Sequence, residues 1–183
     1  MIYIILGEGF EEVEAIAACD VLRRARLPVQ MAGIGGKTVA GAHGIKVEAD
    51  VCVEEMQLPD MEMIVLPGGL GGVASIEGSK SAMDAVEYAL THDRYVAAIC
   101  AAPTILGKRG WLDGRHAVCY PGCEAQMGKA IVHPEKEAVV DGKLITGRAP
   151  GAAIEFGLTL AGILPGGEYD PETVARYMVY ERK

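Results

Sequence analysis

The chain has 183 residues, half of them hydrophobic, and a formal net charge of −8. This length suits one domain with a sizeable core, and the acidic balance argues against binding to the phosphate backbone of nucleic acids. No apolar run reaches the length of about 18 residues that a membrane span needs.

Short apolar runs alternate with segments of helical periodicity along the chain. Such runs are typical of strands buried on both faces. The predicted strands are Met1–Leu6, Pro28–Ala32, Met63–Leu66, Tyr95–Ile99 and Ala117–Tyr120. Two hairpins are also predicted: one pairs Thr38–Ala40 and Ile45–Val47, and the other pairs Ala138–Asp141 and Leu144–Thr146. The predicted helices are Glu11–Ala25, Ser81–Thr91, Pro103–Arg109, Cys123–Met127, Gly151–Leu164 and Pro171–Tyr180. This alternation predicts one α/β domain over residues 1–183 with a mostly parallel sheet.

The start of the first predicted helix is crowded with acidic residues. We expect Glu11 and Glu12 to face water, where they favour the helix dipole. The expected apolar face consists of Val13, Ile16, Ala17 and Val21, and Glu14 neighbours it. A carboxyl partly removed from water has a raised pKa, so we expect Glu14 to stay protonated and to donate a hydrogen bond.

The turn after the first strand resembles a dinucleotide fingerprint only in part. Gly7 and Gly9 are present, but Glu12 stands where the third glycine is required. The acidic residues occupy the place of a pyrophosphate, and the second strand does not end in an acidic residue. We therefore expect no nucleotide cofactor.

Cys100 lies between the apolar run 95–99 and a helical pattern that begins at Pro103. Proline suits the first turn of a helix, so the cysteine falls on a sharp strand-to-helix turn at the carboxyl edge of the sheet. Backbone N–H groups at a helix start favour a thiolate. The arrangement is a cysteine version of a nucleophile elbow, and it predicts a reactive thiol with a pKa below that of free cysteine.

A second loop ends the strand at Leu66 and contains Gly68 and Gly69. In elbow enzymes such a loop provides a backbone N–H for an oxyanion hole, paired with the N–H that follows the nucleophile. In this chain that second donor is Ala101.

The five cysteines are odd in number and irregularly spaced, and the N-terminal strand lacks the features of a signal peptide. Both observations indicate a cytoplasmic protein with reduced thiols. Cys119 and Cys123 are three residues apart, but no second ligand pair follows with zinc-like spacing, so we expect no metal site.

Four segments occur together and in order: residues 9–15 (GFEEVEA), 66–69 (LPGG), 98–103 (AICAAP) and 146–151 (TGRAPG). The set resembles the DJ-1/PfpI superfamily, in its DJ-1-like branch, over about residues 1–164. The resemblance implies a flavodoxin-like α/β sandwich with helices on both faces of the sheet, a homodimer, and cofactor-free chemistry at Cys100. It also implies that Glu14 is the partner acid and that Gly69 belongs to the oxyanion site.

The chain departs from the DJ-1-like pattern at Tyr120, which stands where many members carry a histidine near the cysteine. Tyrosine is a poor base at neutral pH, with a reference pKa of about 10. His43, in the glycine-rich hairpin, is a candidate to reach the same pocket, within the chain or across the dimer. Arg148 is a further candidate accessory residue, and Cys123 is either a resolving thiol or an apolar filler.

Our leading hypothesis is an enzyme that acts on small aldehydes such as methylglyoxal, or on glycated groups, through a hemithioacetal at Cys100. This corresponds to the glyoxalase III and deglycase activities that the resemblance implies. The alternative is a redox-sensing or chaperone-like protein in which Cys100 is oxidised to sulfinate without turnover. A nucleotide-binding module is a third reading, which the acidic first turn disfavours.

Overall fold

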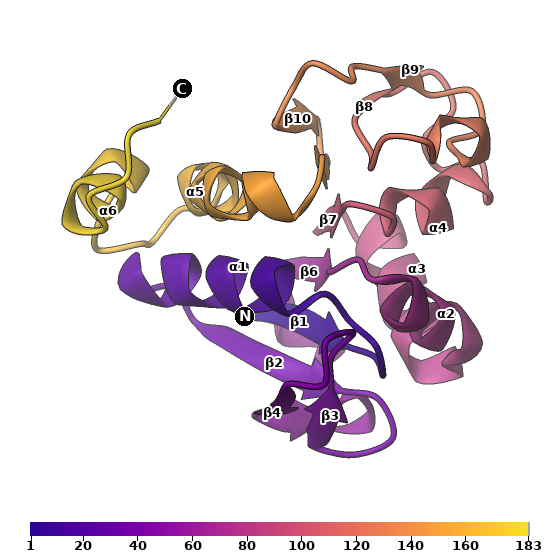
Figure 1. The fold of residues 1–183 in the computed structure, drawn as a ribbon. Coiled ribbons are helices and arrows are strands. Elements are labelled where there is room, and N and C mark those ends of the chain that lie inside the picture. Colours follow the sequence, from indigo (N-terminus) through magenta and orange to yellow (C-terminus); the bar gives the residue numbers. More distant parts are fainter. Residues whose placement is uncertain (183) are drawn as a thin grey trace.

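The computed structural model describes residues 1–182 and contains a seven-stranded central sheet (Figure 1). Its strands run in the order β10-β11-β7-β6-β1-β2-β5, and all neighbouring strands are parallel except β10 and β11. Their bounds are β1 (Ile2–Leu6), β2 (Val29–Gly33), β5 (Val51–Cys52), β6 (Met63–Leu66), β7 (Tyr95–Ile99), β10 (Ala138–Asp141) and β11 (Leu144–Gly147). The predicted α/β fold with a mostly parallel sheet is confirmed.

Helices cover both faces of this sheet (Figure 1). One layer holds α1 (Glu12–Arg24), α5 (Ala153–Ile163) and α6 (Pro171–Tyr177). The other holds α2 (Leu70–Gly78), α3 (Lys80–Thr91) and α4 (Pro103–Gly107). Short 3₁₀ turns are η1 (Val53–Glu55), η2 (Leu58–Asp60), η3 (Glu124–Gln126) and η4 (Pro150–Ala152).

Two small two-stranded sheets lie outside the central one. β3 (Thr38–Ala40) and β4 (Lys46–Glu48) form the predicted glycine-rich hairpin. β8 (His116–Ala117) pairs in parallel with β9 (Ile131–Val132). The predicted strand over 117–120 is therefore shorter and belongs to a separate sheet, and the predicted helix over 123–127 is the 3₁₀ turn η3.

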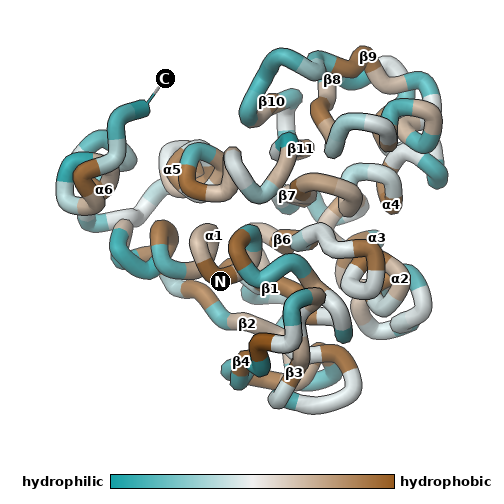
Figure 2. The backbone as a smooth tube through the Cα atoms, in the orientation of Figure 1, coloured by the Kyte–Doolittle hydropathy of each residue, from teal (hydrophilic) through white to brown (hydrophobic). Residues whose placement is uncertain are grey.

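The core has two halves, one on each side of the sheet. In β1, Ile2, Ile4 and Leu6 face the α1 layer, whereas Tyr3 and Ile5 face the α3 layer, because side chains alternate along a strand. In Figure 2 the hydrophobic segments gather where β1 and β6 pass between the helical layers. No helix in the described part of the chain combines the length and apolar character that crossing a bilayer requires.

The buried face of α1 differs from the predicted one. Val13 and Ile16 are 53% and 40% exposed. The helix instead packs against α5 through small residues such as Ala18. The contact is close: a Cβ added to Gly157 of α5 would lie 3.3 Å from the Ala18 Cα. Small residues allow this close approach of two helices, so the helix turns its larger apolar side chains outward. The predicted apolar face was wrong for Val13 and Ile16.

Candidate active site

Cys100 lies on the turn between β7 and α4, as predicted. Its backbone adopts a φ of +66°, a left-handed conformation that a residue with a Cβ rarely occupies. The turn is held on both sides, because the Cys100 N–H donates to the Gly147 carbonyl at 2.9 Å and its carbonyl accepts from the Tyr120 N–H at 2.8 Å. A strained nucleophile position that its surroundings enforce is typical of a functional site.

The loop after β6 passes very close to this sulfur. A Cβ added to Gly68 would lie 2.7 Å from the Cys100 Cβ and 2.8 Å from Glu14 Oε2, so only glycine fits. Gly69 follows with a φ of +80° and forms the N-cap of α2. Sequence reasoning assigned a role to Gly69 but not to Gly68; the signal was the paired glycine at a strand end.

Glu14 projects from α1 to the same point and is 1% exposed. Its Oε2 accepts a hydrogen bond of 2.7 Å from the Gly68 N–H, and its Oε1 is buried with no hydrogen-bond partner among the described residues. Burial raises the pKa of Glu14 to about 7, against the lowering effect of Cys100 and Gly68. The expected partly desolvated carboxyl beside the cysteine is therefore present.

The Cys100 thiol itself has a raised pKa, which corrects the expectation of a lowered one. Burial is the main cause, and the negative charge of Glu14 adds to it. The backbone N–H groups of Ala101 and Gly69 act on the sulfur in the opposite sense and lower its pKa. Two N–H donors do not outweigh burial, and α4, with only five residues, adds little dipole.

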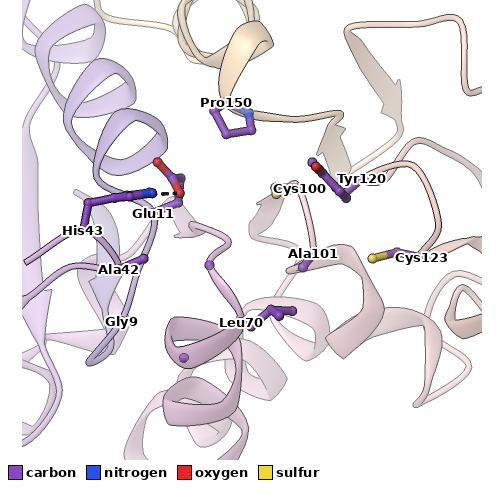
Figure 3. Close-up of a pocket in the computed structure, with 12 residues that line it drawn as sticks. Gly9, Glu11, Ala42, His43, Leu70, Cys100, Ala101, Tyr120, Cys123 and Pro150 are labelled. Carbon is purple, nitrogen blue, oxygen red and sulfur yellow. Dashed lines mark ion pairs between the residues drawn. The ribbon is translucent and has the colours of Figure 1, made fainter.

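A cavity of about 580 Å³ opens over the sulfur (Figure 3). Five of the predicted site residues line it: Cys100, Ala101, Gly69, Tyr120 and His43. The other lining residues are Gly9, Glu11, Ala42, Leu70, Gly71, Cys123 and Pro150.

Two of the predicted site residues stand apart from this lining. Glu14 is absent from it because its carboxylate is buried against Gly68. Arg148 is not brought there either; its guanidinium donates to the Pro134 carbonyl at 3.4 Å.

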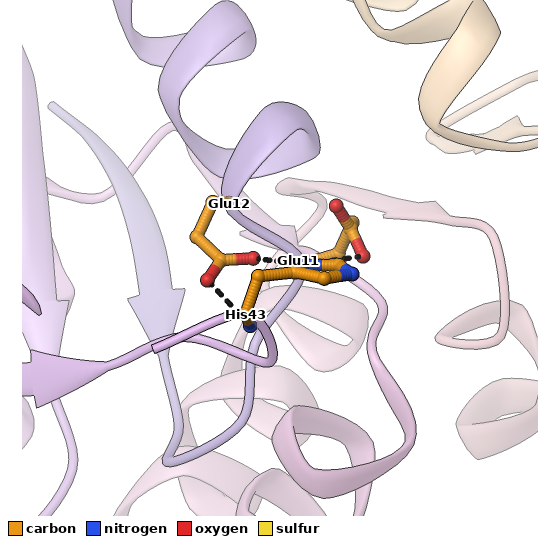
Figure 4. A group of neighbouring side chains, drawn as sticks. All are labelled: Glu11, Glu12 and His43. Atoms are coloured by element: carbon orange, nitrogen blue, oxygen red, sulfur yellow. Dashed lines mark hydrogen bonds and ion pairs between the residues drawn. The ribbon is translucent and has the colours of Figure 1, made fainter. Parts of the chain in front are cut away.

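On the side opposite Cys100, the hairpin brings His43 to Glu11 and Glu12 (Figures 3 and 4). Glu12 does not face water as expected; it is 5% exposed and accepts hydrogen bonds from the His43 and Ile45 N–H groups at 2.7 and 3.4 Å. Burial disfavours ionisation of Glu12, but the hydrogen bonds from His43 and Ile45 prevail and lower its pKa.

The nitrogen and oxygen atoms of Glu11, Glu12 and His43 lie within 4.8 Å of one another, which is close enough for a shared metal ion. However, both oxygens of Glu12 already accept hydrogen bonds, and His43 Nδ1 is engaged with Oε2 at 2.8 Å. The carboxylate of Glu12 and Nδ1 of His43 are therefore already satisfied by each other and by the backbone.

Cys123 lines the cavity and is partly exposed, whereas Cys119 is buried. The Cys123 N–H donates to the Tyr120 carbonyl at 2.9 Å, which closes a turn over residues 120–123. This turn places the side chains of Tyr120 and Cys123 at the cavity wall. All five cysteines are free.

Comparison with known proteins gives a consistent result. The model of the DJ-1/PfpI family matches residues 1–162. The protein dj-1beta of Drosophila melanogaster is 37% identical over 178 residues, covering 96% of this chain and 95% of that protein. A protein of Pyrococcus abyssi named a deglycase is 31% identical over 151 residues, 82% of this chain and 90% of its own.

Solved structures agree with the sequence matches. The crystal structure of Drosophila melanogaster DJ-1beta superposes with a TM-score of 0.92 at 36% identity, covering 99% of this chain and 98% of the other. The structure described as oxidized DJ-1 of Toxoplasma gondii has a TM-score of 0.92 at 28% identity with the same coverage.

Proposed function

The chain belongs to the DJ-1/PfpI family, and on this premise we propose that it is a cofactor-independent cysteine enzyme acting on reactive aldehydes such as methylglyoxal or on glycated groups. The observation that carries the proposal is the sulfur of Cys100, which lies at the base of a cavity between two backbone N–H donors and a buried carboxyl of raised pKa. The name of the Pyrococcus relative supports the glycated class of substrate.

The first step is addition of the Cys100 sulfur to the aldehyde carbon. The new S–C bond forms as the C=O electron pair moves to oxygen, and the Gly69 and Ala101 N–H groups stabilise that oxyanion. The thiol proton passes to Glu14, and the oxyanion then takes up a proton. A carboxyl whose pKa of about 7 matches the working pH suits this transfer in both directions.

Turnover of methylglyoxal by metal-free protein tests the proposal. We expect lactate formation without glutathione, nucleotide or divalent ions, complete loss in Cys100→Ala, and a slower rate in Glu14→Gln. Cys52→Ala is the matched control, because Cys52 is a free cysteine on β5 outside the cavity. Equal rates for Cys100→Ala and the wild type would show that the chemistry is elsewhere.

A redox role for the same thiol is the second candidate. The buried Oε1 of Glu14 has no partner among the described residues, and a protonated carboxyl there would donate to a sulfinate on Cys100. Charge-assisted O–H···O⁻ bonds are short and roughly twice as strong as neutral ones. After mild peroxide treatment we expect most sulfinate in the wild type, less in Glu14→Gln and least in Glu14→Leu, measured by mass spectrometry. Equal oxidation in all three proteins contradicts this role.

We also propose that the protein is a cytoplasmic homodimer. The exposed apolar residues Val13 and Ile16 on α1 offer a face on which a second copy of the chain can pack. Leu70, which lines the cavity, is a further exposed apolar residue, at 82%. Symmetric pairs are the commonest oligomers. The five free cysteines fit the reducing cytoplasm.

A further inference from the structure

His43 is the one imidazole among the residues that line the cavity over Cys100. It stands in the turn between β3 and β4, on the wall opposite the sulfur (Figure 3), and its side chain is 67% exposed. Glu11 and Tyr120 also line the cavity, but imidazole is the side chain that general acid–base catalysis uses most often.

Glu12 fixes the orientation of this imidazole (Figure 4). One carboxylate oxygen lies 2.8 Å from His43 Nδ1, and the other accepts the His43 backbone N–H at 2.7 Å. Glu12 is closely packed, because its buried carboxylate occupies the space that a Cβ on Gly41 would take. With Nδ1 engaged, Nε2 is the ring nitrogen left to exchange protons with a bound molecule.

A nucleophile, an imidazole and a carboxylate that orients the imidazole are the three parts that acid–base-assisted cysteine chemistry uses. Here the imidazole is across the cavity from the nucleophile, so a substrate bound to Cys100 would lie between the sulfur and the ring, and Glu14 is the group left to take the thiol proton. We propose that His43, positioned by Glu12, is the catalytic acid–base residue that moves a proton between the two carbonyl carbons of a ketoaldehyde bound to Cys100, directly or through one water.

This step rests on the proposed aldehyde activity and balances without an external oxidant. Nε2 removes the proton from the sulfur-bearing carbon, and the second oxygen takes up a proton as the double bond of an enediol forms. A proton then returns to the second carbon while the hydroxyl on the first loses its own. The first carbon is oxidised and the second reduced by two electrons, and the resulting thioester is hydrolysed by water to the 2-hydroxy acid and the free thiol.

The electrostatics of the cluster agree with this role. The hydrogen bond to Glu12, together with the charges of Glu11 and Glu12, raises the pKa of His43. The imidazole can therefore return the proton as imidazolium as well as accept it.

The test compares variants in the presence of EDTA, which removes any ion held by the cluster. We expect His43→Ala and His43→Gln to lower kcat by a factor of roughly 10²–10⁴ with little change in KM, and added imidazole to restore kcat in His43→Ala. The rate of Cys100 alkylation should stay at the wild-type value. His92→Ala is the matched control and should be fully active, because His92 caps α3 and is absent from the cavity lining.

Glu12→Gln tests the positioning role. Its amide oxygen can still accept the backbone N–H, but its NH₂ donates to Nδ1 and places the ring proton on Nε2. We expect kcat to fall and added imidazole not to restore it, because the ring still fills the site but carries its proton on Nε2 and cannot accept one there.

Wild-type kcat in His43→Ala, or a loss that imidazole does not restore, overturns the role of His43. The proposed function still stands in that case if Cys100→Ala is inert. Absence of turnover in the wild type overturns both.

Discussion

Cys100 and Glu14 together give up one proton near neutral pH. The pKa of Glu14 is raised to about 7, and that of the Cys100 thiol lies above its ordinary value because of burial and the Glu14 charge. Above pH 7 the pair holds one proton, and when that proton resides on Glu14 the sulfur is a thiolate. The reactivity of Cys100 therefore depends on the ionisation of its partner.

We predict that iodoacetamide alkylates Cys100 with a rate that rises through a pH of about 7, because the pair can then hold its remaining proton on Glu14 and leave the sulfur as a thiolate. Glu14→Gln should remove that inflection, because an amide does not ionise. Peptide mapping after limited labelling across the pH range gives both results. Preferential labelling of Cys123, the other cysteine in the cavity lining, would count against Cys100 as the nucleophile.

The raised pKa of Glu14 also predicts the pH dependence of stability. The native state keeps a proton on Glu14 between its ordinary pKa of 4.5 and about 7, whereas the unfolded state has lost it. The free energy of unfolding should therefore fall as the pH rises through this range, by up to about 3 kcal/mol. Urea denaturation at several pH values measures this, and Glu14→Gln should show a smaller decrease. An equal decrease in both proteins contradicts the assignment.

Gly68 limits what the site tolerates. An alanine Cβ there would lie 2.7 Å from the Cys100 Cβ, so Gly68→Ala should lose activity and about 1–3 kcal/mol of stability through overpacking. Gly78→Ala is the matched control: an added Cβ at the end of α2 contacts nothing within 4 Å, and alanine favours a helix. Thermal melts and methylglyoxal turnover of both variants check the contrast.

At the scale of elements, the segment that carries Tyr120 and Cys123 is tied to the central sheet through β11. Thr146 Oγ1 accepts the Val118 N–H at 2.8 Å, and Thr146 is 1% exposed. This hydrogen bond gives a buried backbone donor its partner.

Thr146→Val should leave that donor unsatisfied, lower stability by about 1–3 kcal/mol, and weaken substrate binding by loosening the cavity wall. Thr159→Val is the control, because Thr159 Oγ1 donates to a carbonyl within α5 that the helix also satisfies. Denaturant melts and KM values of the two variants test this prediction. Equal losses of stability and of substrate binding in Thr146→Val and Thr159→Val would contradict the link between this segment and β11.

Helix α2 shows how packing overrides local preference. It contains Gly71, Gly72 and Gly78, and glycine disfavours helices, so it was not predicted from the sequence. A Cβ added to Gly72 would lie 2.7 Å from the Phe10 Cα. Helix α2 therefore approaches the loop after β1 more closely than it could if position 72 carried a residue other than glycine. That close approach brings Gly69, its N-cap, over Cys100.

At the scale of the whole molecule, the exposed Val13 and Ile16 predict a homodimer through α1. Light scattering at micromolar concentration should give twice the 19.3 kDa of the single chain. The double variant Val13→Glu, Ile16→Glu should be monomeric, because it places charge on that apolar face. Exposed Val140 on β10 provides the control substitution Val140→Glu, which should leave the dimer intact. A wild-type mass of one chain rules the dimer out.

The sequence by itself determined the fold class, the strand-to-helix position of Cys100 and the loop of Gly69. These features follow from the periodicity of buried strands and from the places where glycine and proline interrupt it, which are local properties of the chain. The pairing of β3 with β4 and of β10 with β11 was predictable for the same reason.

Only the tertiary structure decided which residues meet at the site and with what electrostatics. It buried Cys100 and Glu14 together and so raised both pKa values, although the helix start alone suggested a lowered thiol pKa. It turned Val13 and Ile16 outward, drew Glu12 inward to His43, and left Arg148 outside the cavity lining. Burial and pairing between residues 31 positions apart depend on how distant elements pack, and no local pattern of residue types specifies that.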